Sequence, residues 1–364
     1  MIKVLFDHQI FDRQTYGGIS RYFANIIKGG NSAGEIEMIK GFLYTNNYYL
    51  QQNSINFSEL LLSTFLKKSK HIYKKNNNYC NRLLSRGNFE VFHPTYFDTY
   101  FLDQLKKPLV ITIHDMTYEE MPEYFPNNDP LPEQKRLLAN RADKIIAISE
   151  TTKTDIIKHL QVDANKIHVI PHGIDNKAPK YEEVENLPEN YLLFVGSRSG
   201  YKNFFMFARA FKILTEKHKD IVLLLAGGGP LETGDSEFLI RNGIFDKTRQ
   251  ISATDSQLNM LYKNALCFVF PSLYEGFGIP ILEAFKNNCP VILSNCSCFP
   301  EIAGDAALYF NPDSIESLAH QIETLITNKS LKSKLITAGK KKLETYTLDK
   351  CIKQTIELYK SLVD

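Results

Sequence analysis

Short apolar runs alternate along the chain with longer stretches in which apolar residues recur at helical spacing. The apolar runs lie at residues 3–6, 91–93, 109–114 and 144–149, and then at 192–196, 222–227, 267–271 and 291–294. Strands that are buried on both faces are continuously apolar, and parallel strands need crossover connections that are usually helical. The pattern therefore predicts an α/β protein with parallel sheets.

A stretch rich in turn residues divides the strand series into two groups. Residues 171–175, with the sequence PHGID, and the charged segment up to Pro188 show no regular periodicity. A chain of 364 residues with 43% hydrophobic composition is longer than a single core usually organises. We predict an N-terminal domain over residues 1–175, a second domain over 176–345, and a helix over 346–364 that packs back on the first domain.

Charge and composition narrow the class of protein. With 43 Lys and Arg against 41 Asp and Glu, the net charge of +2 does not favour nucleic acid as a partner. No run of 18 apolar residues predicts a membrane-spanning helix, and the first residues are too polar for a signal peptide. The six cysteines, of which Cys296 and Cys298 are the closest pair, lack the paired spacing of a zinc site and indicate reduced thiols. We expect a cytoplasmic protein.

Two cations follow the first predicted strand of the second half. Arg198 and Lys202 come after the apolar run 192–196, at the edge of a sheet where open α/β folds bind ligands. Arginine can bind an anion through two hydrogen bonds, and lysine supplies a compact charge. Taken alone, the pair could equally be two solvated surface cations.

A glycine-containing loop opens a helix after the apolar run 267–271. Residues 271–284 have the sequence PSLYEGFGIPILEA, in which the glycines allow close approach of the backbone to a ligand. Free amides at the start of the helix favour an anion. The carboxylates of Glu275 and Glu283 can accept hydrogen bonds from sugar and ribose hydroxyls. An ordinary strand–loop–helix unit with two exposed glutamates is the alternative.

Together these residues resemble the pattern of glycosyltransferase family 4. The likeness rests on an arginine and a lysine after the first strand of the second domain, and on Glu-x7-Glu preceded by Pro-Ser. It implies a GT-B fold, with two Rossmann-like domains whose parallel sheets face an interdomain cleft. It also implies that Arg198 and Lys202 hold the donor diphosphate, that Glu275 contacts the transferred sugar and that Glu283 contacts the ribose.

Glycine-containing loops in both halves carry the resemblance further. It implies that the amides of Gly276, Phe277 and Gly278 meet the sugar and the phosphates. The segment 16–22, with the sequence YGGISRY, is similar to the glycine loop of the family's first domain. Gly17 and Gly18 would then close over the diphosphate from the opposite domain, whereas a simple flexible turn is the alternative.

A histidine ends the apolar run 109–114. The family has a histidine at this point that contacts the transferred sugar, which implies a catalytic role for His114. Asp115 could orient its ring, and a capping or core histidine is the alternative. His8 and His172 are further candidates, and Ser149 is placed to cap the helix that follows it.

The sequence contains no Asp-x-Asp triplet, so it offers no obvious ligand set for a divalent cation. Arg198, Lys202 and the helix amides would instead stabilise the charge on the leaving diphosphate. The resemblance implies retention of configuration by same-face attack. We therefore expect a retaining, metal-independent hexosyltransferase with no cofactor besides its nucleotide diphosphate sugar.

The surroundings of the glycine loop and of His114 are most similar to bacterial transferases of surface polysaccharide assembly. This likeness implies transfer of mannose from GDP-mannose to a glycan or lipid-linked oligosaccharide in O-antigen or capsule biosynthesis. A UDP-hexose or dTDP-rhamnose donor remains open. So do a GT-B sugar-nucleotide epimerase or hydrolase and a binding module without activity.

One basic stretch stands out from the rest of the chain. Residues 60–89 contain seven Lys and Arg and no acidic residue, and apolar side chains recur among them at roughly helical spacing. We predict peripheral membrane contact through residues 57–89, at the inner face of the plasma membrane. A solvated helix face, or a mobile loop with Asn76, Asn77 and Asn78 at its tip, is the alternative.

Overall fold

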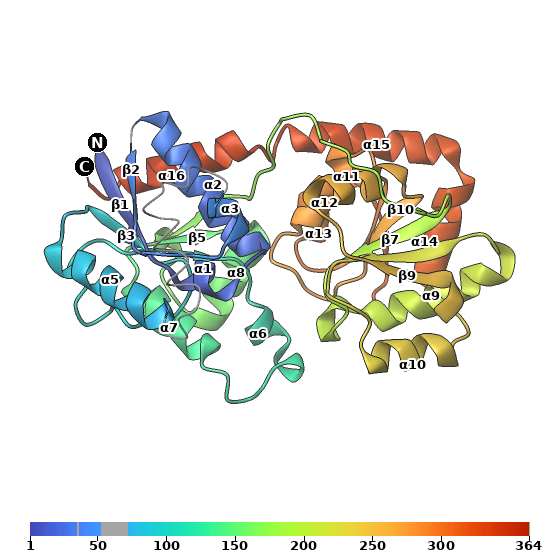
Figure 1. Ribbon diagram of the computed structural model, residues 1–364, viewed down its shortest axis with the longest axis horizontal. Coiled ribbons are helices and arrows are strands. Elements are labelled where there is room, and N and C mark those ends of the chain that lie inside the picture. The colour runs from blue at the N-terminus through green and yellow to red at the C-terminus, as the bar shows by residue number, and fades with distance from the viewer. Residues whose placement is uncertain (35, 52–71, 364) are drawn as a thin grey trace. The chain divides into compact units, whose positions relative to one another are not determined.

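The computed structural model describes residues 1–34, 36–51 and 72–363, which form two compact units (Figure 1). The first unit comprises Met1–Glu119, Pro126–Gly173 and Leu348–Asp364, and the second comprises Glu120–Phe125 and Ile174–Thr347. The chain therefore enters the second unit briefly at residue 120, before it crosses to that unit for its longer segment.

Parallel strands form the centre of the first unit. They are β1 (Ile2–Phe6), β2 (Ile36–Lys40), β3 (Val91–His93), β4 (Val110–Ile113), β5 (Lys144–Ala147) and β6 (Ile167–Val169). Their order is β2-β1-β3 in one group and β4-β5-β6 in the other. A parallel bridge between Phe92 and Leu109 connects the two groups.

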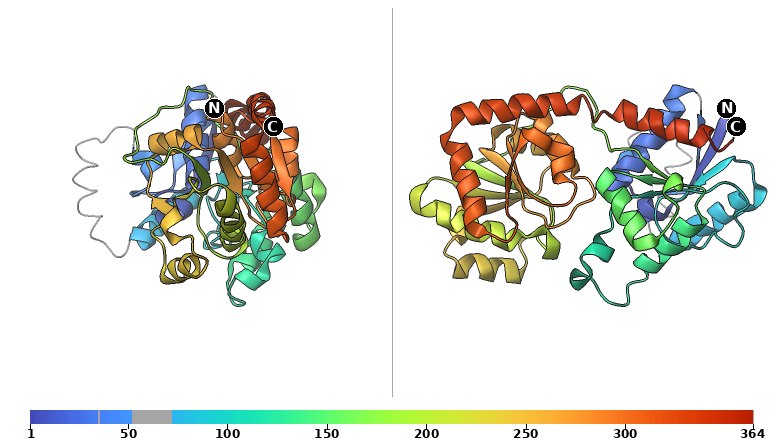
Figure 2. Two further views of the ribbon diagram at one scale, coloured as in Figure 1. Left: turned by 90° about the vertical axis from the view of Figure 1, so that its right-hand side faces the viewer. Right: turned by 180° about the vertical axis from the view of Figure 1, so that it is seen from behind.

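Helices cover both faces of this sheet (Figures 1 and 2). They are α1 (Gln9–Arg13), α2 (Gly18–Ala33), α3 (Tyr48–Gln51), α5 (Ile72–Arg86), α6 (Thr117–Glu120), α7 (Leu131–Arg141), α8 (Glu150–Leu160) and α16 (Leu348–Lys360). On one face, Phe6 packs with Phe23 of α2 and Tyr359 of α16. Because side chains alternate along a strand, Phe92 contributes to the other face, where it contacts Phe101.

The second unit is built on a six-stranded parallel sheet. Its strands are β7 (Tyr191–Val195), β8 (Val222–Ala226), β9 (Thr248–Ile251), β10 (Cys267–Phe270), β11 (Val291–Ser294) and β12 (Ala307–Phe310). The order β12-β11-β10-β7-β8-β9 begins in the middle at β7, runs to one edge, and then returns to the other side of β7 with β10. This is the Rossmann order, and the chain reverses direction across the sheet between β7 and β10.

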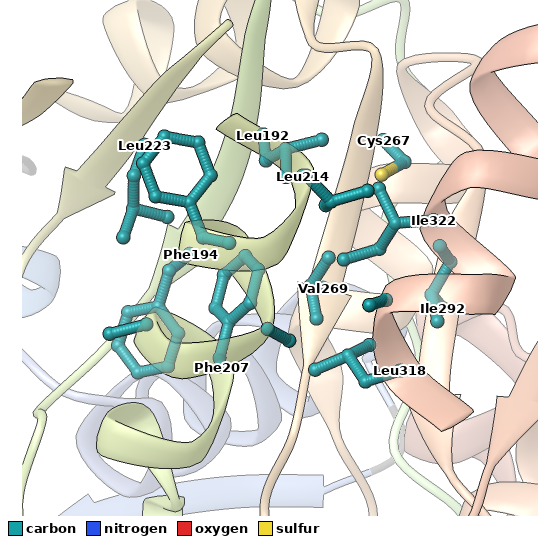
Figure 3. Packing of buried hydrophobic residues seen from close by; sticks show 14 of the residues in the cluster. Leu192, Phe194, Phe207, Leu214, Leu223, Cys267, Val269, Ile292, Leu318 and Ile322 are labelled. Carbon is teal, nitrogen blue, oxygen red and sulfur yellow. The ribbon is translucent and has the colours of Figure 1, made fainter. Parts of the chain in front are cut away.

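Two layers of helices enclose the second sheet. They are α9 (Phe204–Lys217), α10 (Thr233–Arg241), α11 (Asp255–Asn264), α12 (Ile279–Lys286), α13 (Phe299–Ala303), α14 (Ile315–Thr327) and α15 (Lys329–Leu343). In the core on one face, Phe194 and Val269 of the strands pack with Phe207 of α9 and Leu318 of α14 (Figure 3). The other face carries Phe268, which contacts Tyr262 of α11.

Short 3-10 helices complete the two units, at Pro122–Tyr124, Ala164–Lys166, Gly200–Lys202, Phe245–Lys247 and Gly304–Ala306. The predicted α/β architecture with parallel sheets is confirmed. All eight predicted strands are present, and the described residues form four further strands, β2, β6, β9 and β12, that were not predicted.

The basic stretch 57–89 is only partly described. Residues 57–71 lie outside the described residues, and residues 72–86 form α5. The alternative of a loop with Asn76, Asn77 and Asn78 at its tip is wrong, because all three lie within this helix. The side chain of Asn76 is buried, accepts a hydrogen bond from the Leu43 amide at 3.0 Å and donates one to Asp12 at 2.9 Å. None of the helices in the described ranges has the length and apolar character needed to cross a membrane.

Candidate active site

The carboxyl ends of β7 and β10 lie side by side in the second sheet. The two strands pair directly, although β8 and β9 separate them in the chain. The loop after β7 carries Arg198 and Lys202, and the loop after β10 carries Glu275. Because both strands are parallel, both loops leave the same edge at the point where the strand order reverses, which is where such sheets bind ligands.

Lys202 and Glu275 form an ion pair at this edge. The Nζ atom of Lys202 lies 2.5 Å from Oε1 of Glu275, and Ser272 Oγ donates to the same oxygen at 2.8 Å. The side chains are only 20% and 16% exposed, so solvent screens the pair less than it would a surface pair. The other carboxylate oxygen, Oε2, makes no hydrogen bond within the described part of the chain. That oxygen can accept a hydrogen bond from a ligand hydroxyl.

Ser297 fixes the backbone of Glu275. Its hydroxyl donates to the Glu275 carbonyl oxygen at 2.5 Å, and the Glu275 amide lies 3.2 Å from the same Oγ atom. The carboxylate therefore projects from a loop whose position is set by hydrogen bonds.

Arg198 is buried more deeply than Lys202, with 5% of its surface exposed. Its Nε atom donates to Asp235 at 2.8 Å, and its Nη atoms donate to the carbonyl oxygens of residues 227–230 at 2.6–3.4 Å. This loop contains three successive glycines with φ between 69° and 76°. A side chain at Gly228 would lie 2.4 Å from the carbonyl oxygen of Gly196, so the loops after β7 and β8 pack backbone to backbone. The hydrogen bonds of the Arg198 guanidinium therefore hold the 227–230 loop in place.

The loop before α12 brings buried backbone to the same edge of the sheet. Gly278 is the N-cap of α12 and has φ of 92°. Gly276 and Phe277 are also buried, and the Phe277 ring packs edge-on against Tyr346, 5.5 Å between centroids. The ring of Phe277 belongs to the core, so the predicted donor contact would have to come from its amide. On α12, Glu283 is half-buried and accepts a hydrogen bond from Tyr262 Oη at 3.4 Å.

Gly17 and Gly18 lie at the start of α2 in the first unit. Gly17 is the N-cap and has extended backbone, and Gly18 is exposed. The Gln14 side chain accepts a hydrogen bond from the Ser20 amide at 3.2 Å, and Ser20 Oγ donates to the Gly17 carbonyl at 3.1 Å. The amino end of a sixteen-residue helix carries partial positive charge, which suits an anion.

His114 lies at the end of β4, also in the first unit, and it is buried. Its Nδ1 atom lies 3.3 Å from His172 Nε2, and its own Nε2 atom is buried without a hydrogen-bond partner among the described residues. Burial, reinforced by the nearby His93, lowers the pKa of His114 to about 3. The prediction that Asp115 orients this ring is wrong, because neither ring nitrogen contacts Asp115 among the described residues. Asp115 instead accepts a hydrogen bond from the Thr117 amide at 3.0 Å.

Two other residues noted in the sequence, His8 and Ser149, contact neighbouring protein groups. His8 is fully buried, and its Nδ1 atom lies 2.7 Å from Asp12 Oδ2. Ser149 caps α8 as predicted, accepting a hydrogen bond from the Thr152 amide at 3.0 Å. Among the described residues, no group of three His, Cys, Asp or Glu side chains is arranged to hold a metal ion.

Two residues of these surroundings, Asp235 and His93, were not predicted from the sequence. Asp235, the partner of Arg198, lies 37 residues further along the chain, in the first turn of α10, where an acidic residue is ordinarily a helix cap. His93 ends an apolar strand just as His114 does, so the same signal could have identified it.

Family models match both units. The model described as "Glycosyl transferases group 1" matches residues 176–342, and the one described as "Glycosyltransferase Family 4" matches residues 16–178. The chain belongs to glycosyltransferase family 4.

Two curated bacterial proteins illustrate the relatives of this family 4 glycosyltransferase. "O-antigen chain mannosyltransferase B" of Escherichia coli is 27% identical over 277 residues, which cover 72% of this chain and 73% of that protein. "O-antigen chain mannosyltransferase RfbU" of Salmonella typhimurium is 29% identical over 228 residues, which cover 62% of this chain and 63% of RfbU.

Solved structures show the fold of the glycosyltransferase. Sucrose-phosphate synthase from Thermosynechococcus elongatus superposes with a TM-score of 0.77 at 17% identity, covering 100% of this chain and 99% of that one. HepE from Anabaena, in complex with UDP, superposes with a TM-score of 0.73 at 17% identity, over 100% of both chains. The fold is GT-B.

Proposed function

We propose that this glycosyltransferase transfers a hexose, with mannose from GDP-mannose as the preferred donor, with retention of configuration and without a metal ion. The acceptor is a glycan or a lipid-linked oligosaccharide of O-antigen or capsule biosynthesis. The observation that carries the proposal is the Lys202–Glu275 pair at the point where the second sheet reverses its strand order. The choice of mannose is supported by the two relatives named above, both of them mannosyltransferases.

In this proposal the second unit holds the donor. Lys202 lies beside the diphosphate and stabilises the negative charge that grows as the glycosidic bond breaks. The amides before α12 and the positive end of that helix add to this stabilisation. Glu275 accepts a hydrogen bond from a sugar hydroxyl through Oε2, and Glu283 accepts one from the ribose. Arg198 both orders the 227–230 loop and contributes positive charge near the diphosphate.

The first unit contributes Gly17, Gly18 and His114. The exposed start of α2 offers backbone amides to the diphosphate, and His114 Nε2 bonds to a hydroxyl of the transferred sugar. The new bond forms on the face from which the diphosphate leaves, and a departing phosphate oxygen takes the acceptor's proton. No side chain is then required as a base. His114 suits this role because burial keeps its imidazole neutral at neutral pH.

The donor can be tested by thermal unfolding with GDP, UDP and dTDP in parallel. The nucleotide that matches the site should raise the melting temperature most, because only the folded state binds it. Turnover of GDP-mannose with a lipid-linked oligosaccharide, followed by NMR of the product anomer, tests donor and stereochemistry together. Stabilisation by UDP alone would replace mannose with the second candidate, a UDP-hexose, which the UDP-bound HepE structure supports.

Metal independence is tested by the same assay in excess chelator. We expect turnover to persist, because Lys202, Arg198 and helix amides supply the charge that a cation would supply elsewhere. Complete loss of activity that magnesium or manganese restores would contradict this part of the proposal. Release of free sugar or an epimer from the donor alone, as fast as with acceptor, would favour a hydrolase or epimerase.

Peripheral membrane contact through residues 57–89 remains part of the proposal. In the described portion, Lys74 and Lys75 are exposed on α5. Replacing Lys67, Lys68, Lys74 and Lys75 with glutamate should abolish sedimentation with anionic liposomes at low salt, while turnover of a soluble acceptor stays close to wild type.

The second unit offers a control with the same change of charge. Lys329, Lys334, Lys340 and Lys341 are exposed on α15, and their replacement with glutamate should leave liposome binding intact. Equal loss in both variants would mean that net charge, and not the 57–89 segment, governs sedimentation.

A further inference from the structure

His114 and His172 form a hydrogen-bonded pair of imidazoles in the first unit. Their ring planes differ by only 9°, and their centroids are 5.3 Å apart. That separation is close to the 3.3 Å between Nδ1 of His114 and Nε2 of His172 plus the radii of the two rings. The ring planes are therefore nearly parallel, and the two nitrogens are close enough for the N–H of one to point toward the lone pair of the other.

The hydrogen bond between His114 Nδ1 and His172 Nε2 contains a single proton. Burial lowers the pKa of His114 to about 3 and that of His172 well below its usual value, so both rings are neutral at neutral pH. A neutral imidazole has one N–H and one acceptor nitrogen. If His172 donates to Nδ1 of His114, the proton of His114 must be on Nε2. If His172 accepts, Nε2 of His114 is an acceptor. The position of the proton on His172 therefore determines whether Nε2 of His114 is a hydrogen-bond donor or an acceptor.

The other end of His114 has no protein partner. Its Nε2 atom is buried and makes no hydrogen bond to any described residue. A buried ring nitrogen without a partner is costly, so such an atom is expected where a ligand completes the contact. Under the proposed function, on which this inference rests, the ligand is the transferred sugar, whose hydroxyls both donate and accept.

Tyr22 braces the pair from α2. Its ring lies edge-on to both imidazoles, with centroids 5.1 Å from His114 and 4.9 Å from His172. The interplanar angles are 85° and 78°, so Tyr22 makes an edge-to-face contact with each imidazole. The Tyr22 hydroxyl is itself held 3.3 Å from Thr112 Oγ1.

Further hydrogen bonds connect Thr112, the partner of Tyr22, to α16. Thr112 Oγ1 lies 3.0 Å from Nε2 of His93, and Nδ1 of His93 lies 2.6 Å from the hydroxyl of Tyr359. All three residues are buried. These hydrogen bonds connect Tyr22, which packs on the imidazole pair, to the core of the first unit.

We propose that His172 is a positioning residue that holds His114 in a single tautomer, so that His114 Nε2 presents one fixed hydrogen-bonding role to a hydroxyl of the transferred hexose. The hydrogen bond to Nδ1 couples the tautomer of His114 to that of His172, and Tyr22 packs edge-on against both rings. His172 does not touch the sugar itself.

The test compares His172→Phe, which keeps a planar ring but cannot hydrogen-bond, with His172→Gln, whose terminal amide can donate or accept. NMR of the protein labelled with 15N-histidine reports the tautomer of His114, whose signals are assigned from the His114→Gln spectrum. We expect one tautomer in the wild type and a mixture in His172→Phe. In His172→Gln, which can again hydrogen-bond to Nδ1, the mixture should shift back toward the wild-type tautomer. With GDP-mannose, kcat should fall about tenfold to a hundredfold in His172→Phe, the range for losing the partner that orients a metal-ligand histidine. The donor KM should change less, and His172→Gln should recover most of kcat.

His168→Phe is the matched control, because it removes a half-buried histidine of the same unit on β6. It should leave both the His114 tautomer and kcat unchanged. If His172→Phe does not fold, His172→Asn takes its place, since its shorter side chain cannot reach Nδ1. An unchanged tautomer in the variant without the hydrogen bond overturns the inference. A changed tautomer together with wild-type turnover in both that variant and His114→Ala overturns the sugar contact instead, which belongs to the proposed function.

Discussion

Arg198 and Lys202 leave the same loop after β7 but end in different surroundings. Lys202 is partly exposed and pairs with Glu275, whose side chain is also partly exposed. Arg198 is buried, and its guanidinium is occupied by Asp235 and by the carbonyl oxygens of residues 227–230. Removal of Lys202 should therefore affect chemistry, whereas removal of Arg198 should affect chemistry and folding together.

Lys202→Met should lower kcat by roughly two to three orders of magnitude, the range for losing a strong charge-stabilising donor. The melting temperature should change little, because Glu275 keeps its hydrogen bond from Ser272 and has access to solvent. Lys217→Met is the control, since it removes an exposed pair with Glu323 far along α9 and should alter neither quantity. A wild-type rate in Lys202→Met would contradict the proposal that Lys202 stabilises the donor diphosphate.

Arg198→Ala should lower the free energy of unfolding by about 3–5 kcal/mol, because it leaves the buried Asp235 without its partner. Urea unfolding measures this loss. In the double variant Arg198→Ala with Asp235→Asn, part of the stability should return, since no unpaired charge stays buried and the asparagine oxygen can still accept from the Glu232 amide. Turnover should stay low in both variants. Equal stability of the single and double variants would show that the pair is not what stabilises this loop.

At the scale of elements, the start of α12 depends on one backbone conformation. Gly278 has φ of 92°, and a Cβ atom there would lie 2.9 Å from Ile281 Cδ1 and 3.3 Å from Phe299 Cε1. Both strain and crowding therefore oppose a side chain at this position.

Gly278→Ala should lower the free energy of unfolding by about 1–3 kcal/mol, measured by urea unfolding, and reduce turnover because the amides before α12 move. Gly234→Ala is the matched control, since Gly234 lies in α10 with open space around it. There the substitution should stabilise the protein by about 0.4–1 kcal/mol through the unfolded state. A neutral Gly278→Ala would mean that the loop adapts without cost.

At the scale of the whole molecule, the first unit is assembled from segments far apart in the chain. Its core includes Cys351, Ile356, Leu358 and Tyr359 of α16, which follows the entire second unit in the sequence. The second unit includes its own remote segment, Glu120–Phe125, where Tyr124 and Phe125 contact Tyr201.

A chain that stops after Thr347 should lose the fold of its first unit, because buried side chains of α16 would be missing from the core. The second unit should remain folded, since its sheet and helices are complete without α16. Hydrogen exchange followed by mass spectrometry separates the two outcomes: amides of β1 and β4 should exchange rapidly, while those of β7 and β10 stay protected. Protection of β1 and β4 in the shortened chain would contradict this expectation.

The residue types of the second unit's site could be predicted because each follows a recognisable apolar strand. Lys202 and Glu275 were placed at the ends of two such strands from local pattern alone. Their contact depends on β7 and β10 becoming neighbours, and the pairing of Arg198 with Asp235 depends on how the loop after β8 folds. Likewise Asp115, next to His114 in the chain, was chosen as its partner, but the fold brings His172 to that ring from 58 residues away.

The strands also differ in whether the sequence alone predicts them. Once the bridge between Phe92 and Leu109 joins β3 to the group that begins with β4, the eight predicted strands lie inside their sheets, whereas the four that were missed, β2, β6, β9 and β12, lie at the edges. A central strand is covered on both faces, so its apolar character is a local property that the sequence alone determines. An edge strand such as β9, with the sequence TRQI, is only partly buried along its whole length and carries no such signal. Its place in the sheet, like the partner of each charged side chain, was decided only by the tertiary structure, because it depends on long-range packing.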